Sequence, residues 1–296
     1  MERSELFEGF EKRRIETPDA EIEVVRGGGG PPVLLLHGYP QTHAMWHLVA
    51  PWLAEDFTVV ATDLRGYGDS SKPFGDEDHS TYSKRTMARD QAAVMSSLGF
   101  DSFAVVGHDR GGRAGHRMAL DYPDRVSKLA VLDIVPTRHV YATVQKDLAT
   151  AYYHWFFFIQ PYDLPETLIG ADPVYYLRKK LGGWGTPLET FAPAALAEYE
   201  RCFDAATIHA SCEDYRAAAS IDLVHDEEDR KEGRKVECPL LAFWGGRGVV
   251  EKTYDVEAVW RKYANDVTGR PLDAGHFLAE ERPDETAQEL TAFLKE

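Results

Sequence analysis

The sequence predicts an α/β fold, in which a mostly parallel central sheet carries helices on both faces and a helical lid is inserted into the core. Short continuous apolar runs, typical of buried strands, recur along the chain and read PPVLLLHG, FTVVATDL, FAVVGHD, KLAVLDIV and PLLAFWG. Stretches with helical periodicity separate them, among them AMWHLVAPWLAE, KRTMARDQAAVMSSLG and RAGHRMALDYP. Strands that alternate with helices in this way predict a parallel sheet covered on both faces.

An earlier strand precedes these runs. Apolar and polar residues alternate in AEIEVVRGG (20–28), which predicts an antiparallel strand. The glycines and prolines of RGGGGPP (26–32) are interpreted as a turn. They do not indicate a phosphate-binding loop, because no Gly-Lys-Ser or Gly-Lys-Thr follows them.

The alternation of strands and helices is interrupted once. The segment 136–236 is rich in aromatic residues, has a helical rhythm and lacks runs of the buried-strand type. We expect this segment to form the lid, and residues 1–135 together with 237–296 to form the α/β core. The charged stretch HDEEDRKEGRK (225–235) is interpreted as a solvated return from the lid to the core.

The overall composition narrows the partners and the compartment. A formal net charge of −16 over 296 residues argues against a nucleic-acid or anionic-membrane partner. The N-terminal MERSELFEGFEKRR lacks the apolar stretch of a signal peptide, and no window approaches the ~18 uncharged apolar residues of a membrane span. Cys202, Cys212 and Cys238 have no disulfide-like spacing, so we expect a cytoplasmic protein. Histidine spacings such as His37/His43 do not match a metal-ligand pattern, and we expect neither a metal nor an organic cofactor.

A carboxylate stands where a predicted strand turns into a predicted helix. Asp109 lies at the centre of GHDRG (107–111), which has the form G-x-X-x-G. The better-known version carries serine, held on a strained turn above the sheet. Amide groups at the start of the following helix favour a negative charge nearby. On this pattern alone, Asp109 is either a nucleophile or the N-cap of the helix.

Aspartate at this position supports a different chemistry from serine. A carboxylate that displaces a halide from an sp3 carbon forms an ester, and activated water can attack the carbonyl of that ester. A serine in the same reaction would form an ether, which water does not readily cleave. Asp109 therefore favours substitution at alkyl carbon followed by hydrolysis of the ester.

Two further residues complete a catalytic set. His276, in LDAGHFLAEERP, is the late histidine that follows a nucleophile and an acid in this chain order. Asp133 ends the predicted strand LAVLDIV, whereas the loop WGGRGVV has Gly248 at the alternative acid position and no carboxylate before Glu251. We therefore assign Asp133 to orient His276. The alternative role for Asp133 is a cap at the hinge of the lid.

At this point the sequence resembles a known family. The segments LLLHGYPQTHAMW, ATDLRGYGDSSKP, VVGHDRGGRAGHRMALDYPDRV and AGHFLAEERP look like the α/β-hydrolase superfamily, and specifically its epoxide hydrolase and dehalogenase branch. The resemblance runs from about residue 20 to the C-terminus and implies the α/β-hydrolase fold. It also implies that the backbone N–H groups of Tyr39, in the HGYP loop, and Arg110 form an oxyanion hole. His37 in that loop is interpreted as structural.

The residue after the nucleophile distinguishes the branches. Related dehalogenases usually carry tryptophan at the position of Arg110, and epoxide hydrolases often do. Arg113 follows one helical turn later on the same face. Two guanidinium groups beside Asp109 suit a substrate carboxylate, and they offset its repulsion by Asp109. The alternative is a surface face of arginines paired with acids. Arg117 is interpreted as a charge on the helix surface.

The lid sharpens the resemblance. AYYHWFFF and CEDYRAAASIDLVHD, together with the GHDRGGRAGHR turn, closely resemble the fluoroacetate (haloacetate) dehalogenases. This resemblance implies that His154, Trp155 and Tyr215 donate hydrogen bonds to the departing halide, and it suggests a homodimer. Without it, these residues would be interpreted as packing residues of a helical lid. Trp184, in LGGWGTP, is expected to be a packing residue; the alternative is that it lines an entry path.

The expected function is hydrolytic dehalogenation of a small anionic substrate. A 2-haloacetate, fluoroacetate first, would yield glycolate and halide through an ester on Asp109, and His276 would act as the general base. Two alternatives stay open. One is an epoxide hydrolase that uses Tyr215 and either Tyr152 or Tyr153 to protonate the epoxide. The other is a non-catalytic ligand receptor on the same fold, because fold alone does not establish activity.

Overall fold

An eight-stranded sheet forms the centre of the computed structural model, which describes residues 6–296. The strand order is β1-β2-β4-β3-β5-β6-β7-β8. The bounds are β1 (Glu11–Glu16), β2 (Glu21–Gly28), β3 (Pro32–Leu36), β4 (Thr58–Thr62), β5 (Phe103–His108), β6 (Val126–Leu132), β7 (Leu240–Gly245) and β8 (Val267–Leu272). The β1–β2 and β2–β4 pairs are antiparallel and the other pairs are parallel, which confirms the predicted fold class and the early antiparallel strand.

The sequence patterns did not reveal the two edge strands. β1 reads EKRRIE and β8 reads VTGRPL, and most of their side chains are exposed or only partly buried. An edge strand has a solvent-facing side, so it need not carry the apolar run that identifies a central strand.

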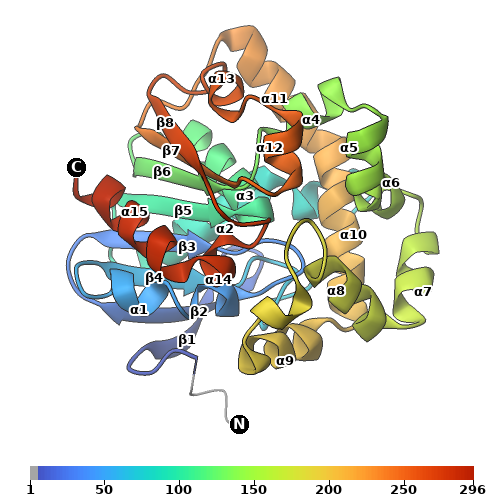
Figure 1. Cartoon of the computed structure of the whole chain (residues 1–296), viewed down its shortest axis with the longest axis horizontal. Coiled ribbons are helices and arrows are strands. Elements are labelled where there is room, and N and C mark those ends of the chain that lie inside the picture. The colour runs from blue at the N-terminus through green and yellow to red at the C-terminus, as the bar shows by residue number, and fades with distance from the viewer. Residues whose placement is uncertain (1–5) are drawn as a thin grey trace.

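Helices cover both faces of the sheet (Figure 1). In chain order the helices outside the insertion are α1 (Ala50–Leu53), α2 (Lys84–Ser97), α3 (Asp109–Asp121), α12 (Val249–Thr253), α13 (Val256–Trp260), α14 (Leu278–Glu281) and α15 (Pro283–Lys295), with short 3-10 turns η2 (His43–Trp46) and η3 (Ser80–Tyr82). α2 packs beside α3, and α1 packs beside α15. None of the helices in residues 6–296 combines the length and the apolar character needed to span a membrane.

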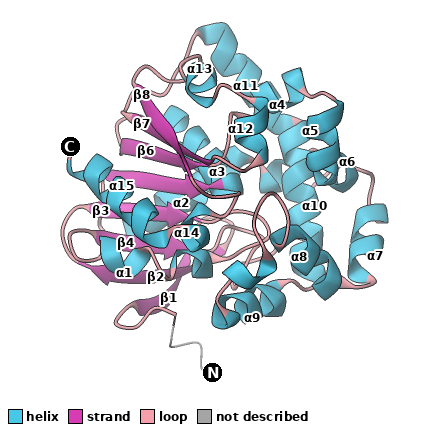
Figure 2. Ribbon diagram, in the orientation of Figure 1, coloured by secondary structure: helices cyan, strands magenta, loops and turns pink. Residues whose placement is uncertain are grey.

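A second group of helices lies beyond one end of the sheet, between β6 and β7 in the chain (Figure 2). These are α4 (Thr137–Thr143), α5 (Lys146–Ala151), α6 (Tyr153–Phe158), α7 (Leu164–Gly170), α8 (Pro173–Leu181), α9 (Pro193–Cys202), α10 (Ala205–Ala219) and α11 (Ile221–Glu232), with the 3-10 turn η4 (Leu188–Thr190). We refer to residues 136–236 as the insertion. The division into a core and a lid domain stays a prediction.

Two expectations about charged residues are wrong. The stretch 225–235 is not simply a solvated return, because most of it belongs to α11 and Asp229 within it is buried. Arg117 is also buried, at 2% exposure, and pairs with Asp121, Asp226 and Asp229. The sequence hides this pairing because α3 and α11 lie about a hundred residues apart in the chain.

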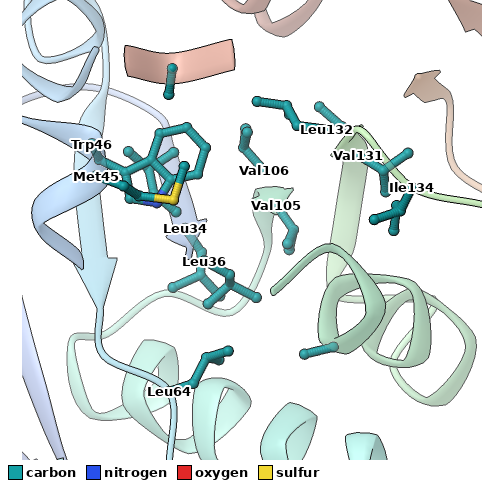
Figure 3. Close-up of a cluster of buried hydrophobic side chains, with 14 of the residues drawn as sticks. Leu34, Leu36, Met45, Trp46, Leu64, Val105, Val106, Val131, Leu132 and Ile134 are labelled. Atoms are coloured by element: carbon teal, nitrogen blue, oxygen red, sulfur yellow. The ribbon is translucent and has the colours of Figure 1, made fainter. Parts of the chain in front are cut away.

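The core between the sheet and its helices fixes the ends of the central strands. Figure 3 shows part of it, with Leu34, Leu36, Met45, Trp46, Leu64, Val105, Val106, Val131, Leu132 and Ile134. Each of these side chains is at most 2% exposed. Burying an apolar side chain of this size contributes about 1.5–3 kcal/mol to folding. This packing holds the carboxyl ends of β5, β6 and β7 in place, and the predicted site residues follow those ends.

Candidate active site

Asp109 begins α3 directly after β5 and has a backbone φ of 45°, in the left-handed region. Such a conformation is strained for a residue other than glycine. The turn also needs a bare backbone at Gly111, where a Cβ would lie 2.4 Å from the carbonyl oxygen of His37. The N-cap of α3 is His108, so Asp109 does not occupy the N-cap position that was the alternative interpretation.

One oxygen of the Asp109 carboxylate is held by a neighbouring loop. The backbone N–H of Tyr39 donates to Asp109 Oδ1 at 2.9 Å, which is a contact that one donor of an oxyanion hole could make. This approach depends on Gly38, because a Cβ there would lie 2.5 Å from the Cβ of Asp109. His37 is structural, as predicted: its Nε2 accepts from the N–H of Leu64 at 3.0 Å.

The electrostatic surroundings favour an ionised carboxylate at Asp109. Burial alone would raise the pKa of the Asp109 carboxyl, but the positive charges of His276 and Arg113 outweigh burial and lower the pKa below its usual value. Asp109 therefore carries its negative charge at neutral pH, although only 7% of the side chain is exposed.

His276 and Asp133 form a buried pair. His276 Nδ1 lies 2.5 Å from Asp133 Oδ2, and Asp133 Oδ1 accepts from the N–H of Gly245 at 2.9 Å. Burial alone would lower the pKa of His276, but the hydrogen bond and the charge of Asp133 outweigh burial and raise it. A Cβ at Gly248 would lie 3.6 Å from Asp133 Oδ1, so the two candidate acid positions converge in space.

His108, for which the sequence suggests no role, connects the nucleophile turn to the histidine loop. Its Nε2 lies 2.8 Å from the carbonyl oxygen of His276, and the two rings are 4.5 Å apart. Burial lowers the pKa of His108 to about 3, so the ring is neutral and Nε2 is the donor in this bond. His108 therefore fixes the position of His276 relative to Asp109.

The structure brings Arg110 to the site and anchors it there. Arg110 is fully buried and donates through Nε and Nη2 to the two carboxylate oxygens of Asp214, at 2.9 and 2.6 Å. The guanidinium lies 4.1 Å above the ring of Tyr215, and its Nη1 has no hydrogen-bond partner. One edge of the Arg110 guanidinium is thus occupied by the Asp214 carboxylate, and Nη1 stays free to donate.

Arg113 lies beside it with a different set of contacts. Its Nη1 donates to the carbonyl oxygen of Val135 at 2.9 Å and to Thr137 Oγ1 at 3.1 Å, and its Nε has no partner. The guanidinium lies 4.7 Å from the ring centre of Trp155. No carboxylate lies within 4.0 Å of Arg113 among residues 6–296, so its charge is not cancelled by an ion pair.

The three aromatic residues implied by the resemblance form one buried cluster. The ring of Tyr215 lies 5.4 Å from that of His154 and 5.9 Å from that of Trp155. Burial lowers the pKa of His154 well below its usual value and raises the pKa of Tyr215, so both side chains are neutral. His154 Nδ1 has no hydrogen-bond partner. Neutral imidazole, indole and phenol groups are therefore gathered within reach of the two arginines.

Two features of the site were missed. Asp214 on α10 binds Arg110, Lys84 and the hydroxyl of Tyr67. In the sequence, only its position directly before Tyr215 could have indicated that it lies near the site. Trp184, expected to pack rather than to line an entry path, lies 5.1 Å from both the His154 and the His276 rings. Within residues 6–296, no group of three or more His, Cys, Asp or Glu side chains is arranged to hold a metal ion.

Comparison with known proteins agrees with this geometry. The alpha/beta hydrolase fold family model matches residues 31–283. The chain is 49% identical to the fluoroacetate dehalogenase of Burkholderia sp over 293 residues, which cover 98% of this chain and 96% of the relative. A soluble epoxide hydrolase of Corynebacterium sp. (strain C12) is 35% identical over 267 residues, 88% of this chain and 89% of the relative.

Solved structures show the same fold. One described as an alpha/beta hydrolase from Nostoc sp PCC 7120 has a TM-score of 0.95 at 60% identity, and the match covers 96% of this chain and 98% of that chain. The chain therefore belongs to the haloacetate dehalogenase family of the α/β hydrolases and is a hydrolase that acts on carbon–halide bonds.

Proposed function

We propose that the chain hydrolyses 2-haloacetates, fluoroacetate first, to glycolate and halide through an ester on Asp109. The observation that carries the proposal is the Asp109 carboxylate, ionised and held by Tyr39 N–H at one oxygen. The haloacetate carboxylate would bind Arg113 and the free Nη1 of Arg110. This pose directs the halogen-bearing carbon towards Asp109.

The first step is a substitution at carbon. Asp109 Oδ2 attacks the halogen-bearing carbon, a C–O bond forms, and the C–halogen bond breaks with its electron pair on the halide. His154, Trp155 and Tyr215 donate hydrogen bonds to the leaving halide. Fluoride is small and strongly hydrated, so several fixed neutral donors replace the water that it would otherwise need.

The second step is ester hydrolysis. His276 Nε2 takes a proton from water, and the hydroxide attacks the Asp109 carbonyl carbon. Oδ1 then becomes the oxyanion, already within hydrogen-bond reach of Tyr39 N–H, with Arg110 N–H as the second proposed donor. Collapse of the intermediate releases glycolate, which takes the proton from His276. Haloacetate and water thus yield glycolate, halide and one proton overall.

The test is halide release by the purified chain from fluoroacetate, with chloroacetate and a neutral epoxide alongside. We expect fluoride release that Asp109→Asn abolishes. Chloride release alone would contradict the fluoride preference but retain the nucleophile and the arginines. Diol formation from the epoxide without halide release would contradict the proposal, and acid binding without turnover would indicate a receptor.

The epoxide hydrolase alternative has less support in the site. Tyr152 stacks on Trp155 at 5.7 Å, and Tyr153 is 47% exposed. A neutral epoxide also has no use for two buried guanidinium groups.

We further expect a homodimer, which sedimentation velocity measures directly.

A further inference from the structure

A lysine in the insertion is buried without a counter-ion. Lys180, near the end of α8, is 4% exposed. Among residues 6–296, no carboxylate oxygen lies within 4.0 Å of its ammonium nitrogen. Burial of an ammonium without a paired anion is costly, and fully buried lysines are rare. Lys180 therefore needs an explanation that an ordinary surface lysine does not.

Aromatic rings take the place of the missing carboxylate. The ammonium nitrogen lies 3.7 Å from the ring centre of Tyr153, 5.2 Å from that of Trp184 and 5.6 Å from that of Tyr176. Aromatic faces stabilise a cation through their electron density but do not cancel its charge. The cage thus leaves the charge of the protonated ammonium uncancelled and available to an anion.

The cage lies between solvent and the active site. Tyr153 is 47% exposed, whereas Trp184 on the other side of the ammonium contacts His154 and His276 at 5.1 Å each. Only one indole ring therefore separates Lys180 from the general base and from a proposed halide donor. The charge of Lys180 is also the largest contribution, after burial, to the lowered pKa of His154.

An anionic substrate needs such a charge outside the pocket. The chain carries a net charge of −16, and two of its carboxylates, those of Asp109 and Asp133, lie at the site itself. Asp214 accepts hydrogen bonds from two of the three guanidinium nitrogens of Arg110 and pairs with its charge. Arg113 is therefore the guanidinium beside the nucleophile whose charge no ion pair cancels. A local cation near an active site raises the capture rate of anions even when the whole molecule repels them.

We infer that Lys180, in its cage of Tyr153, Tyr176 and Trp184, attracts the substrate carboxylate from solvent and guides it towards Arg110 and Arg113. This inference rests on the proposed function. Lys180 does not contact the reacting atoms, so it acts on capture and not on the chemical steps.

The test compares Lys180→Met with Lys179→Met, a matched control on the same helix whose side chain is exposed. We expect Lys180→Met to lower kcat/KM for fluoroacetate about tenfold and to weaken its dependence on salt, with kcat within about twofold of wild type. Lys179→Met should leave both constants within about twofold. Equal kcat/KM in Lys180→Met and wild type would overturn the inference.

A pH profile separates charge from packing. Burial lowers the pKa of Lys180 to about 7, so its charge is present below that pH and is lost above it. The ionisable groups that face it are Tyr153 and His154 from α6 and Tyr176 from α8. In Lys180→Arg the charge persists, and the fall in kcat/KM above pH 7 should disappear. An unchanged fall would show that Lys180 only packs.

The outcome stays separate from that of the proposed function. Halide release by wild type tests the function alone. If wild type releases none, the association rate of acetate, followed by tryptophan fluorescence, still compares wild type with Lys180→Met. A slower association in the variant supports the inference, and equal rates overturn it.

Discussion

The hydrogen bond from Tyr39 N–H to Asp109 Oδ1 distinguishes the two oxygens of the nucleophile. An oxygen that already accepts from the backbone is the poorer attacker, so Oδ2 is the one expected to bond to carbon. After substitution, the ester carbonyl is Oδ1, which is still held by the same N–H. In the proposed mechanism, a single contact therefore orients the nucleophile and later stabilises the oxyanion.

Asp133 and Gly248 give the first prediction. Asp133→Asn removes the charge that raises the pKa of His276 and should slow ester hydrolysis by on the order of 10³-fold. Halide should then appear as a burst of one equivalent while alkylated Asp109 accumulates, as mass spectrometry of the intact chain would reveal. Steady release at the wild-type rate would exclude Asp133 as the orienting acid.

A second variant checks the geometry of the same pair. A Cβ at Gly248 lies near the Asp133 oxygens, so Asp133→Asn combined with Gly248→Asp places a carboxylate on the same histidine. We expect partial recovery of turnover and a pH profile shifted back towards wild type. Gly248→Ala in the same background is the control and should give no recovery.

At the scale of elements, buried charges tie α3 and α2 to α10. Asp214 binds Arg110 on α3 and Lys84 on α2. Burial raises the pKa of an isolated carboxyl, but Arg110 and Lys84 outweigh burial here and hold the pKa of Asp214 well below its usual value. This cluster fixes the position of Arg110 relative to Asp109, so it would determine from a distance where the proposed substrate ligand lies.

Removing the charge of Asp214 should therefore affect both folding and binding. Asp214→Asn leaves Arg110 without its counter-ion and Lys84 with Asp222 alone, at 3.8 Å, and should cost about 3–5 kcal/mol of unfolding free energy. KM should rise more than kcat falls. Glu200→Gln, which breaks the exposed pair with Arg178, is the control and should leave urea unfolding unchanged. Equal stability of the two variants would refute this role.

The contact between α9 and α14 predicts how the free energy of unfolding depends on pH. Burial raises the pKa of Glu280 from 4.5 to about 8, and Tyr199 Oη donates to it at 2.9 Å. The folded chain thus binds this proton more tightly, so its contribution to stability is complete below pH 4.5 and is lost as pH rises through 8.

Glu280→Gln should abolish this loss. Between pH 5 and 8, the unfolding free energy of wild type should fall by on the order of 1–3 kcal/mol more than that of the variant. Glu285→Gln, whose side chain on α15 is 40% exposed, should behave as wild type. Parallel curves for wild type and Glu280→Gln would contradict the assignment of a protonated Glu280.

The whole molecule shows which features a sequence encodes locally. The central strands were predictable because each is buried on both faces and reads as an apolar run. The Asp109 turn was predictable because its glycines and its place between strand and helix are contiguous. The contacts of Asp214 and Lys180 were not, because their partners lie on other elements and no local pattern records them.

The net negative charge of the whole molecule opposes the binding of an anion at the site. A chain of net charge −16 repels an anionic substrate, so the positive groups must act locally and in a dry environment. Arg113 supplies such a positive group beside Asp109, and we propose that Lys180 supplies another on the approach to it. Asp214 anchors Arg110 at the site.

The measurement that tests the central claim most directly is a single turnover of fluoroacetate in heavy-oxygen water, with enzyme in excess, followed by mass spectrometry of the peptide that contains Asp109. The account predicts one heavy oxygen in the Asp109 carboxylate and unlabelled glycolate, because water attacks the ester carbonyl and not the substrate carbon. Labelled glycolate with an unlabelled Asp109 would show that water attacks the substrate directly, and would contradict the covalent route.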